Sequence, residues 1–389
     1  MLAPLLTVAT LLIGAPAVRA SPCVAMDINW NLLAFGLGSK DWNAGTQDQW
    51  GSAGKATDIT TSGRPPFDGA NTSCYLSQFT NAIYVMNGDA SNPSNIHLYD
   101  ATAKSWSTQT VTTGTFDPSS FNAILDHDTN VFYAVSKGEL FSLDMALLTS
   151  ANATALPWND VQKTPYGDSY QPVMALAQNH IHFIDVPGTP AGDANIFVIH
   201  FSYFQPEVQS YPIADGSTFP ATHGQASSFF QESGVQQEFA FIPDDGSKTY
   251  VINVETNSTQ ALAGPTTKDA KATYFAGLSS LVQLDSAGAV SYLPYQQGNT
   301  AVNSAATWSP VSALSSVVPV TTSASSAAAS GTAKASGTAS STGSAKASSS
   351  ASPSSSNTST SGSSNGAMSK VFMSGTLGAL VVGAVALLL

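Results

Sequence analysis

The 389-residue chain has little charge and only two cysteines. Asp, Glu, Lys and Arg make up 10% of its residues, and the 25 acidic side chains outnumber the 13 basic ones. An acidic protein without a basic patch repels the phosphate backbone of nucleic acid and anionic lipid head groups. We therefore expect no nucleic-acid partner.

Long helical patterns are also missing between residues 21 and 320. Apolar residues in this region alternate with polar ones or form short blocks, as they do in β-strands. The two longest apolar runs lie at the ends of the chain. Each is shorter than the ~20 residues that a membrane-spanning helix needs. The sequence therefore favours an all-β domain over residues 21–320, flanked by two short apolar ends.

The first apolar end predicts secretion. Residues 5–14 are apolar, and the small residues Val18 and Ala20 follow at the two positions that a signal peptidase recognises. The usual basic start is absent, because residues 1–4 contribute only the α-amino group. We predict a signal peptide over residues 1–20, cleaved after Ala20.

The second apolar end predicts a glycosylphosphatidylinositol (GPI) anchor. Asn365-Gly366-Ala367 is a triplet of small residues, and a spacer separates it from the apolar residues 377–389. This order is typical of a GPI signal, whose apolar tail is removed on attachment. We predict attachment at Asn365, with Ser361 to Ser364 as alternatives, and a propeptide over 366–389. The lipid would place the protein in the outer leaflet of the bilayer; a retained tail anchor is the other interpretation.

Residues 321–365 consist almost entirely of Ser, Thr, Ala and Gly, with Lys334 and Lys346 as the only charges. Such a segment cannot bury enough apolar surface to offset the entropy of ordering, so we predict a disordered stalk. Its Ser and Thr content suggests O-linked sugars. The order of signal, globular domain, stalk and GPI signal resembles that of fungal cell-surface and cell-wall glycoproteins.

Strand patterns repeat along the globular region. Strands are predicted to begin near residues 83, 132, 181 and 239, at steps of 49, 49 and 58, and a second strand follows each of them. An aromatic residue recurs after these pairs at Trp106, Trp158 and Tyr211. Repetition at this period indicates the blades of a propeller. Residues 26–65, with Trp30, Trp42 and Trp50, fit the repeat least well.

The unit over residues 81–108 resembles a kelch repeat. It has a small-residue turn at Asn87-Gly88, then Leu98-Tyr99-Asp100, then Trp106, although the family normally has two glycines at the turn. The resemblance implies four-stranded blades and no particular activity. Together with the period and length, it predicts a kelch-like β-propeller of six or seven blades over residues 21–320.

The two cysteines, Cys23 and Cys74, predict one disulfide bond in an oxidising compartment. This bond would tie the N-terminus to the first well-formed blade. The first and last blades of a propeller must also be joined, and we expect an N-terminal strand to complete the last blade. Four N-glycosylation sequons predict exposed turns: Asn71, Asn152, Asn257 and Asn357.

Candidate catalytic and metal-binding motifs are weak. His180 and His182 share one face of a strand, but no third ligand is placed beside them. Residues 126–130 begin like a calcium loop, but Val131 and Lys137 stand where that loop needs Gly and Glu. A copper-radical oxidase would need one of the two cysteines for a cross-link to tyrosine. We therefore assign no catalytic residue, metal ligand or cofactor.

Two functions remain open. The first is a non-enzymatic surface glycoprotein that binds a glycan or a protein at a propeller face. The second is a wall-tethered enzyme, carbohydrate-active or similar to galactose oxidase. Convergence of His with Tyr, or of two or three carboxylates, on the central channel would favour the enzyme.

Overall fold

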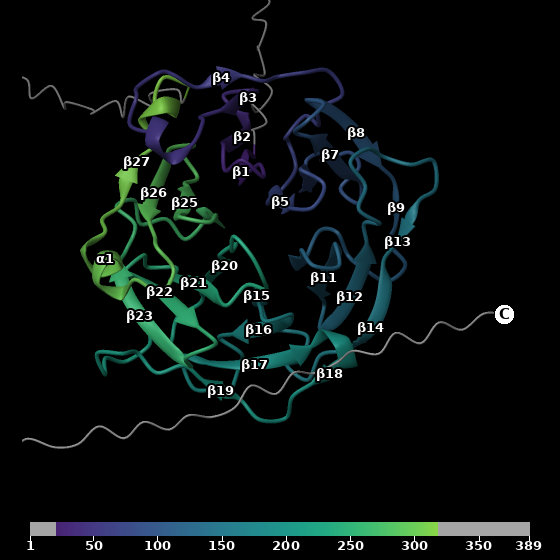
Figure 1. The fold of residues 1–389 in the computed structure, drawn as a ribbon. Coiled ribbons are helices and arrows are strands. Elements are labelled where there is room, and N and C mark those ends of the chain that lie inside the picture. Colours follow the sequence, from purple (N-terminus) through teal and green to yellow (C-terminus); the bar gives the residue numbers. More distant parts are fainter. Residues whose placement is uncertain (1–20, 318–389) are drawn as a thin grey trace, which may run out of the picture. The chain divides into compact units, whose positions relative to one another are not determined.

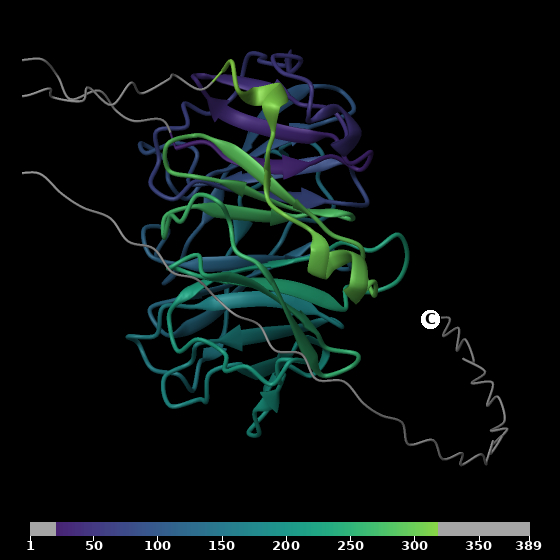
Figure 2. The same cartoon turned by 90° about the vertical axis from the view of Figure 1, so that its left-hand side faces the viewer.

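Residues 21–317 are described by the computed structural model, and they form six antiparallel sheets around one axis (Figure 1). In each sheet the strands pair in chain order, from the axis to the rim. Figure 2 shows the same ring from its side. The fold is a six-bladed β-propeller, which confirms the predicted all-β class and sets the number of blades at six. The predicted signal peptide, stalk and GPI propeptide, with Asn357 and Asn365, lie outside the described residues.

The first three blades occupy the N-terminal half of the ring. Blade 1 consists of β1 (Cys23–Met26), β2 (Leu32–Leu37), β3 (Lys40–Asn43) and β4 (Thr57–Asp58). Blade 2 consists of β5 (Ser73–Ser77), β6 (Ala82–Met86), β7 (Ile96–Asp100) and β8 (Ser105–Gln109). Blade 3 consists of β10 (Asn122–Asp126), β11 (Val131–Ser136), β12 (Glu139–Asp144) and β14 (Asn159–Lys163).

The other three blades complete the ring. Blade 4 consists of β15 (Val173–Ala177), β16 (His180–Ile184), β17 (Asp193–Val198) and β18 (Tyr203–Phe204), with β19 (Gln209–Ser210) also paired to β17. Blade 5 consists of β20 (Gly224–Ser228), β21 (Glu238–Pro243), β22 (Lys248–Asn253) and β23 (Ser258–Ala263). Blade 6 consists of β24 (Thr273–Ala276), β25 (Ser280–Leu284), β26 (Val290–Pro294) and β27 (Ser309–Pro310).

The remaining elements are short. Two strands, β9 (Val111–Thr112) and β13 (Leu156–Pro157), form a parallel pair between blades 2 and 3. The helical turns are η1 (Gln47–Gln49), η2 (Ile199–Phe201), α1 (Thr300–Ala305) and η3 (Ser312–Leu314). None of the helices within residues 21–317 has the length and apolar character to cross a membrane.

The predicted repeat marks the second strand of each of blades 2 to 5. These strands are β6, β11, β16 and β21, and every residue of β6 and β21 is buried. Sheets in a propeller pack face to face, so both faces of an inner strand are covered. This packing explains why the sequence shows short continuous apolar blocks where a half-exposed strand would alternate.

Residues 26–65, which fit the repeat least well, belong to blade 1. Its second strand, β2, has the sequence LLAFGL and is buried throughout. Trp50 is 1% exposed and packs edge-on against Tyr292 of blade 6, with ring centroids 4.8 Å apart. Trp30 and Trp42 are only partly buried. The long connection between β3 and β4 conceals the period in this blade.

The expected closure of the ring by an N-terminal strand is wrong. Blade 6 is completed by its own β27, and blade 1 by its own β4. Instead, the segment that contains η3 runs along the β3–β4 connection. The Ala313 amide donates to the Trp50 carbonyl (3.0 Å), and the Ala56 amide donates to the Ala313 carbonyl (3.3 Å). The C-terminal part of the described chain therefore joins the last blade to the first.

A disulfide bond links Cys23 in β1 to Cys74 in β5, with a Cα–Cα distance of 5.7 Å, as predicted. It joins the inner strands of blades 1 and 2. Because both cysteines are in this bond, neither is available for a thioether cross-link to tyrosine.

We expect replacement of both cysteines by serine to lower the free energy of unfolding. The bond closes a loop with a sequence separation of 51 residues. The chain-entropy model gives such a loop about 4 kcal/mol. Urea unfolding followed by tryptophan fluorescence measures the effect, and reduction of the unmodified protein serves as the control. A double variant as stable as the oxidised protein would contradict the prediction.

Candidate functional site

A cavity of about 210 Å³ lies on the axis of the propeller and is the candidate binding site. All six inner strands, β1, β5, β10, β15, β20 and β24, contribute to its wall. We call this cavity the central channel. Its polar wall residues are Thr72, Ser73, Tyr75, Asn122, Gln225, Ser227, Ser228, Gln236, Thr273 and Tyr274.

The inner strands have one edge that no neighbouring strand covers. Side chains from the adjacent blade bind part of this edge. Ser228 Oγ accepts a hydrogen bond from the Leu176 amide, and Ser227 Oγ accepts one from the Ala276 amide, both at 2.8 Å. In the same way, Asn122 Nδ2 donates to the Pro172 carbonyl at 2.7 Å. These bonds fix the positions of the inner strands, so the wall of the channel is preorganised.

The wall of the channel carries no ionised group. Among the lining residues, all within the described part of the chain, there is no Asp, Glu, His, Lys or Arg. Burial raises the pKa of Tyr75 and of Tyr274 to about 12, so both phenols are neutral at physiological pH. The convergence of His or carboxylates that would favour an enzyme does not occur in this lining. The channel offers hydrogen bonds to an uncharged ligand.

One end of the channel is closed by residues 229–237, which we call the axial loop. This loop connects β20 to β21 of blade 5, and its Phe230 and Gln236 line the cavity. The Phe230 ring packs against Trp30 of blade 1 and His127 of blade 3, with centroids 5.6 and 5.7 Å apart. The Gln236 carbonyl accepts a 2.7 Å hydrogen bond from the Gln178 amide of blade 4. The loop thus connects blade 5 to the adjacent blade 4 and to blades 1 and 3.

The other end of the channel is the accessible one. It is formed by the first residues of the inner strands, where Asn122 is exposed and Ser73 and Thr273 are partly exposed. By contrast, Phe230 and Gln236 at the closed end are 7% and 4% exposed. The channel is therefore a blind cavity that a ligand would enter where the inner strands begin.

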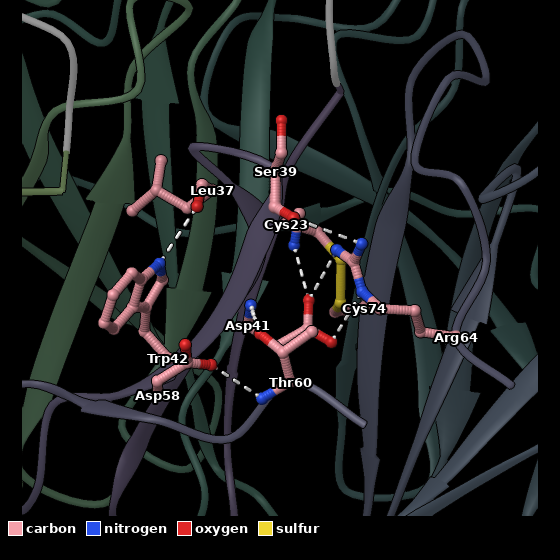
Figure 3. A network of polar contacts seen from close by, with 10 residues as sticks. Cys23, Leu37, Ser39, Asp41, Trp42, Asp58, Thr60, Arg64 and Cys74 are labelled. Carbon is pink, nitrogen blue, oxygen red and sulfur yellow. Dashed lines mark hydrogen bonds and ion pairs between the residues drawn. A yellow bond between two sulfur atoms is a disulfide. The ribbon is translucent and has the colours of Figure 1, made fainter. Parts of the chain in front are cut away.

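The connection between β4 and β5 borders this entrance and is held by a buried ion pair (Figure 3). Arg64 Nε and Nη2 donate to the two oxygens of Asp41 at 2.9 and 2.8 Å. Asp41 is completely buried and also accepts from the Gly36 amide at 2.9 Å. The guanidinium lies over the Phe67 ring, 4.9 Å from its centroid. The ion pair thereby anchors the segment that ends at Thr72 in the channel wall.

Three of the predicted glycosylation residues, Asn71, Asn152 and Asn257, lie in exposed loops or turns. Asn71 directly precedes the channel residue Thr72. Their exposure is compatible with glycosylation, which stays a prediction.

His182 and the calcium-like segment have structural positions, whereas His180 is half-buried, with its Nδ1 2.5 Å from the Gln178 carbonyl. His182 is 2% exposed and packs against Tyr211 and Phe239. Burial lowers its pKa to about 3, so it is neutral. Asp126 accepts from the Asp128 amide (3.2 Å) and the Thr129 hydroxyl (2.6 Å) in the β10–β11 turn. Residues 21–317 contain no group of three His, Cys, Asp or Glu side chains placed to hold a metal ion.

The axial loop and the channel were not predicted from the sequence. The one available signal was the longer step of 58 residues before blade 5, compared with 49 earlier. Part of this extra length is the extended connection between β17 and β20, which contains β19. The axial loop, which lies between β20 and β21, also falls within this step. The longer step shows that residues are inserted before β21, but it does not show that they reach the propeller axis.

The comparisons with known proteins identify no family for this chain. No protein-family model matches the chain, and no curated protein matches it. Among solved structures, the chain is similar to one titled "Structure of YjhT", with 10% sequence identity and a TM-score of 0.45. That similarity covers 77% of this chain and 100% of the other.

We expect Arg64→Leu to destabilise the protein strongly. The substitution leaves the Asp41 carboxylate buried without its cation, and breaking a buried ion pair in this way costs about 3–5 kcal/mol. Lys40→Leu is the matched control, because it breaks the exposed ion pair to Asp58 and should cost about 1 kcal/mol or less. Urea unfolding of both variants measures the difference. Equal stability of the two would show that the Arg64 ion pair does not anchor the entrance.

Proposed function

We propose that this protein is a GPI-anchored glycoprotein of the fungal cell surface or wall, and that its propeller binds an uncharged glycan in the central channel. The proposed binding role rests on the properties of the central channel. It is preorganised, blind and neutral, and polar side chains from several blades converge on it. Sites that bind small ligands commonly combine an apolar wall with a few fixed polar groups.

An uncharged sugar fits this wall better than a protein segment does. Eight of the ten polar wall residues carry hydroxyl or amide groups on small or flexible side chains, and the other two are tyrosines. Hydroxyl groups of a sugar can donate to and accept from such groups. The cavity of about 210 Å³ has room for the end of a glycan chain. A folded protein surface would reach only its entrance.

The ends of the described chain are compatible with a tether. Ser21 precedes β1, and its amide donates to the Phe67 carbonyl at 2.7 Å. Val317 approaches Gly38, in the turn between β2 and β3. Both ends thus lie on the face where the inner strands begin. The disulfide bond suits an oxidising extracellular compartment, which supports secretion.

Release and binding can be tested together. Phospholipase C treatment of intact cells should release the protein, and the released protein should bind uncharged glycans on an array. Asn122→Trp, which places a large ring at the channel entrance, should weaken that binding about tenfold or more. Asn159→Trp is the matched control, because Asn159 is exposed on the outer strand of the same blade.

Several outcomes would contradict the proposal. Failure of phospholipase to release the protein would contradict the lipid anchor. Binding that Asn122→Trp does not weaken would place the ligand elsewhere, and capture of a protein without any glycan would replace the glycan as ligand. Release of reducing sugar or hydrogen peroxide by the purified protein would identify the alternative, a wall-tethered enzyme.

A further inference from the structure

A second hollow lies on the face opposite the channel entrance. Two adjoining depressions, of about 230 and 560 Å³, share the residues Asn31, Asn43, Ile59 and Lys104. They lie between the turns of blade 1 and the β7–β8 turn of blade 2, at the face where the inner strands end. We call this continuous hollow the blade 1–2 groove.

The groove differs from the rest of the described chain in its lysines, which make no ion pairs there. The chain has 13 Lys and Arg residues, of which four, Arg19, Lys334, Lys346 and Lys370, lie outside residues 21–317. Of the nine within the described range, four form ion pairs with carboxylates: Lys40, Arg64, Lys137 and Lys163.

Three more lysines lie close to carboxylates. Lys248, Lys268 and Lys271 each help to lower the pKa of a neighbouring aspartate. The remaining two, Lys55 and Lys104, make no ion pair within residues 21–317, and both line the blade 1–2 groove. In a chain with a net charge of −12, this placement concentrates unneutralised positive charge in one hollow.

The rest of the groove is lined by uncharged polar groups. Four amide side chains, Asn29, Asn31, Asn43 and Gln49, are joined by Ser52 and Thr57. The carboxylate in the groove, Asp27, is 7% exposed and accepts hydrogen bonds from the backbone N–H groups of Asn29 and Asn31 and from Asn31 Nδ2, each at 2.9 Å. Because Asp27 is buried and hydrogen-bonded within its own turn, it leaves both ammonium groups free for a ligand.

We propose that the blade 1–2 groove binds a carboxylate-bearing segment of an acidic polysaccharide. Lys55 and Lys104 would bind carboxylates, and the amide side chains would bind the hydroxyl groups between them. The amide and hydroxyl groups that line the groove can donate hydrogen bonds to, and accept them from, the hydroxyl groups of a sugar chain. The groove has no deep apolar pocket for peptide side chains, since Ile59 and Leu33 are its largest aliphatic residues. This site shares no residue with the central channel and goes beyond the proposed function.

The test uses the full chain, purified in detergent, and a defined probe. The probe is a hexamer of galacturonic acid, and its methyl ester supplies the same chain without charge. We expect the double substitution Lys55→Gln and Lys104→Gln to lower the affinity for the acidic hexamer about tenfold. The matched control is Lys248→Gln with Lys268→Gln, which removes the same charge from blade 5 and from the connection between β23 and β24, and it should change the affinity less than about twofold.

The outcomes separate the groove from its alternatives. Loss of affinity for the acidic hexamer in the groove variant alone, with weak binding of the ester, supports the proposal. Equal loss in both double variants would show a general effect of net charge and overturn it. Tighter binding of hexaglutamate than of the hexamer would assign the groove to acidic peptides and also overturn it. All these variants should bind uncharged glycans in the channel as the unmodified protein does. A result that contradicts the groove can therefore be distinguished from one that contradicts the channel.

Discussion

The structure depends on how the propeller satisfies the inner edge of each blade. Every inner strand has backbone N–H and C=O groups that no further strand pairs with. An unpaired edge is costly when buried and invites other chains when exposed. Here serine, asparagine, glutamine and tyrosine side chains of one blade bind backbone groups in, or directly before, the inner strand of an adjacent blade. The same bonds hold the ring together and give the channel its neutral polar wall.

The ring must also close, and three separate devices contribute to this. The disulfide bond fixes blades 1 and 2, the segment with η3 fixes blade 6 to blade 1, and the axial loop packs against blades across the axis. None of them exchanges a strand between the first and last blades, which is the closure expected from the sequence. Because each blade contains strands from one continuous stretch of chain, the closure of the ring depends on contacts between blades.

The local patterns of the sequence predicted the blades well. The second strands of blades 2 to 5 stand out because face-to-face packing requires continuous apolar residues there, and the cysteine pairing followed from their number. Blade 1 was obscured because its outer strands are short and separated by 13 residues, from Ala44 to Ala56. The channel and the groove could not be predicted, since both are formed by residues from different blades. Lys55 and Lys104, for example, come together only after blades 1 and 2 have packed.

The two candidate sites differ in charge because their surroundings differ. The channel lies among six blades, where an ionised side chain would lose its hydration without gaining a partner, so only neutral groups are tolerated. The groove is open to water, where a lysine retains its hydration and a free ammonium group costs little. In most of the described chain, nearby aspartates neutralise such lysines. Lys55 and Lys104 make no such ion pair within residues 21–317. A ligand that supplies carboxylates to these two ammonium groups would explain why they are placed together in one groove.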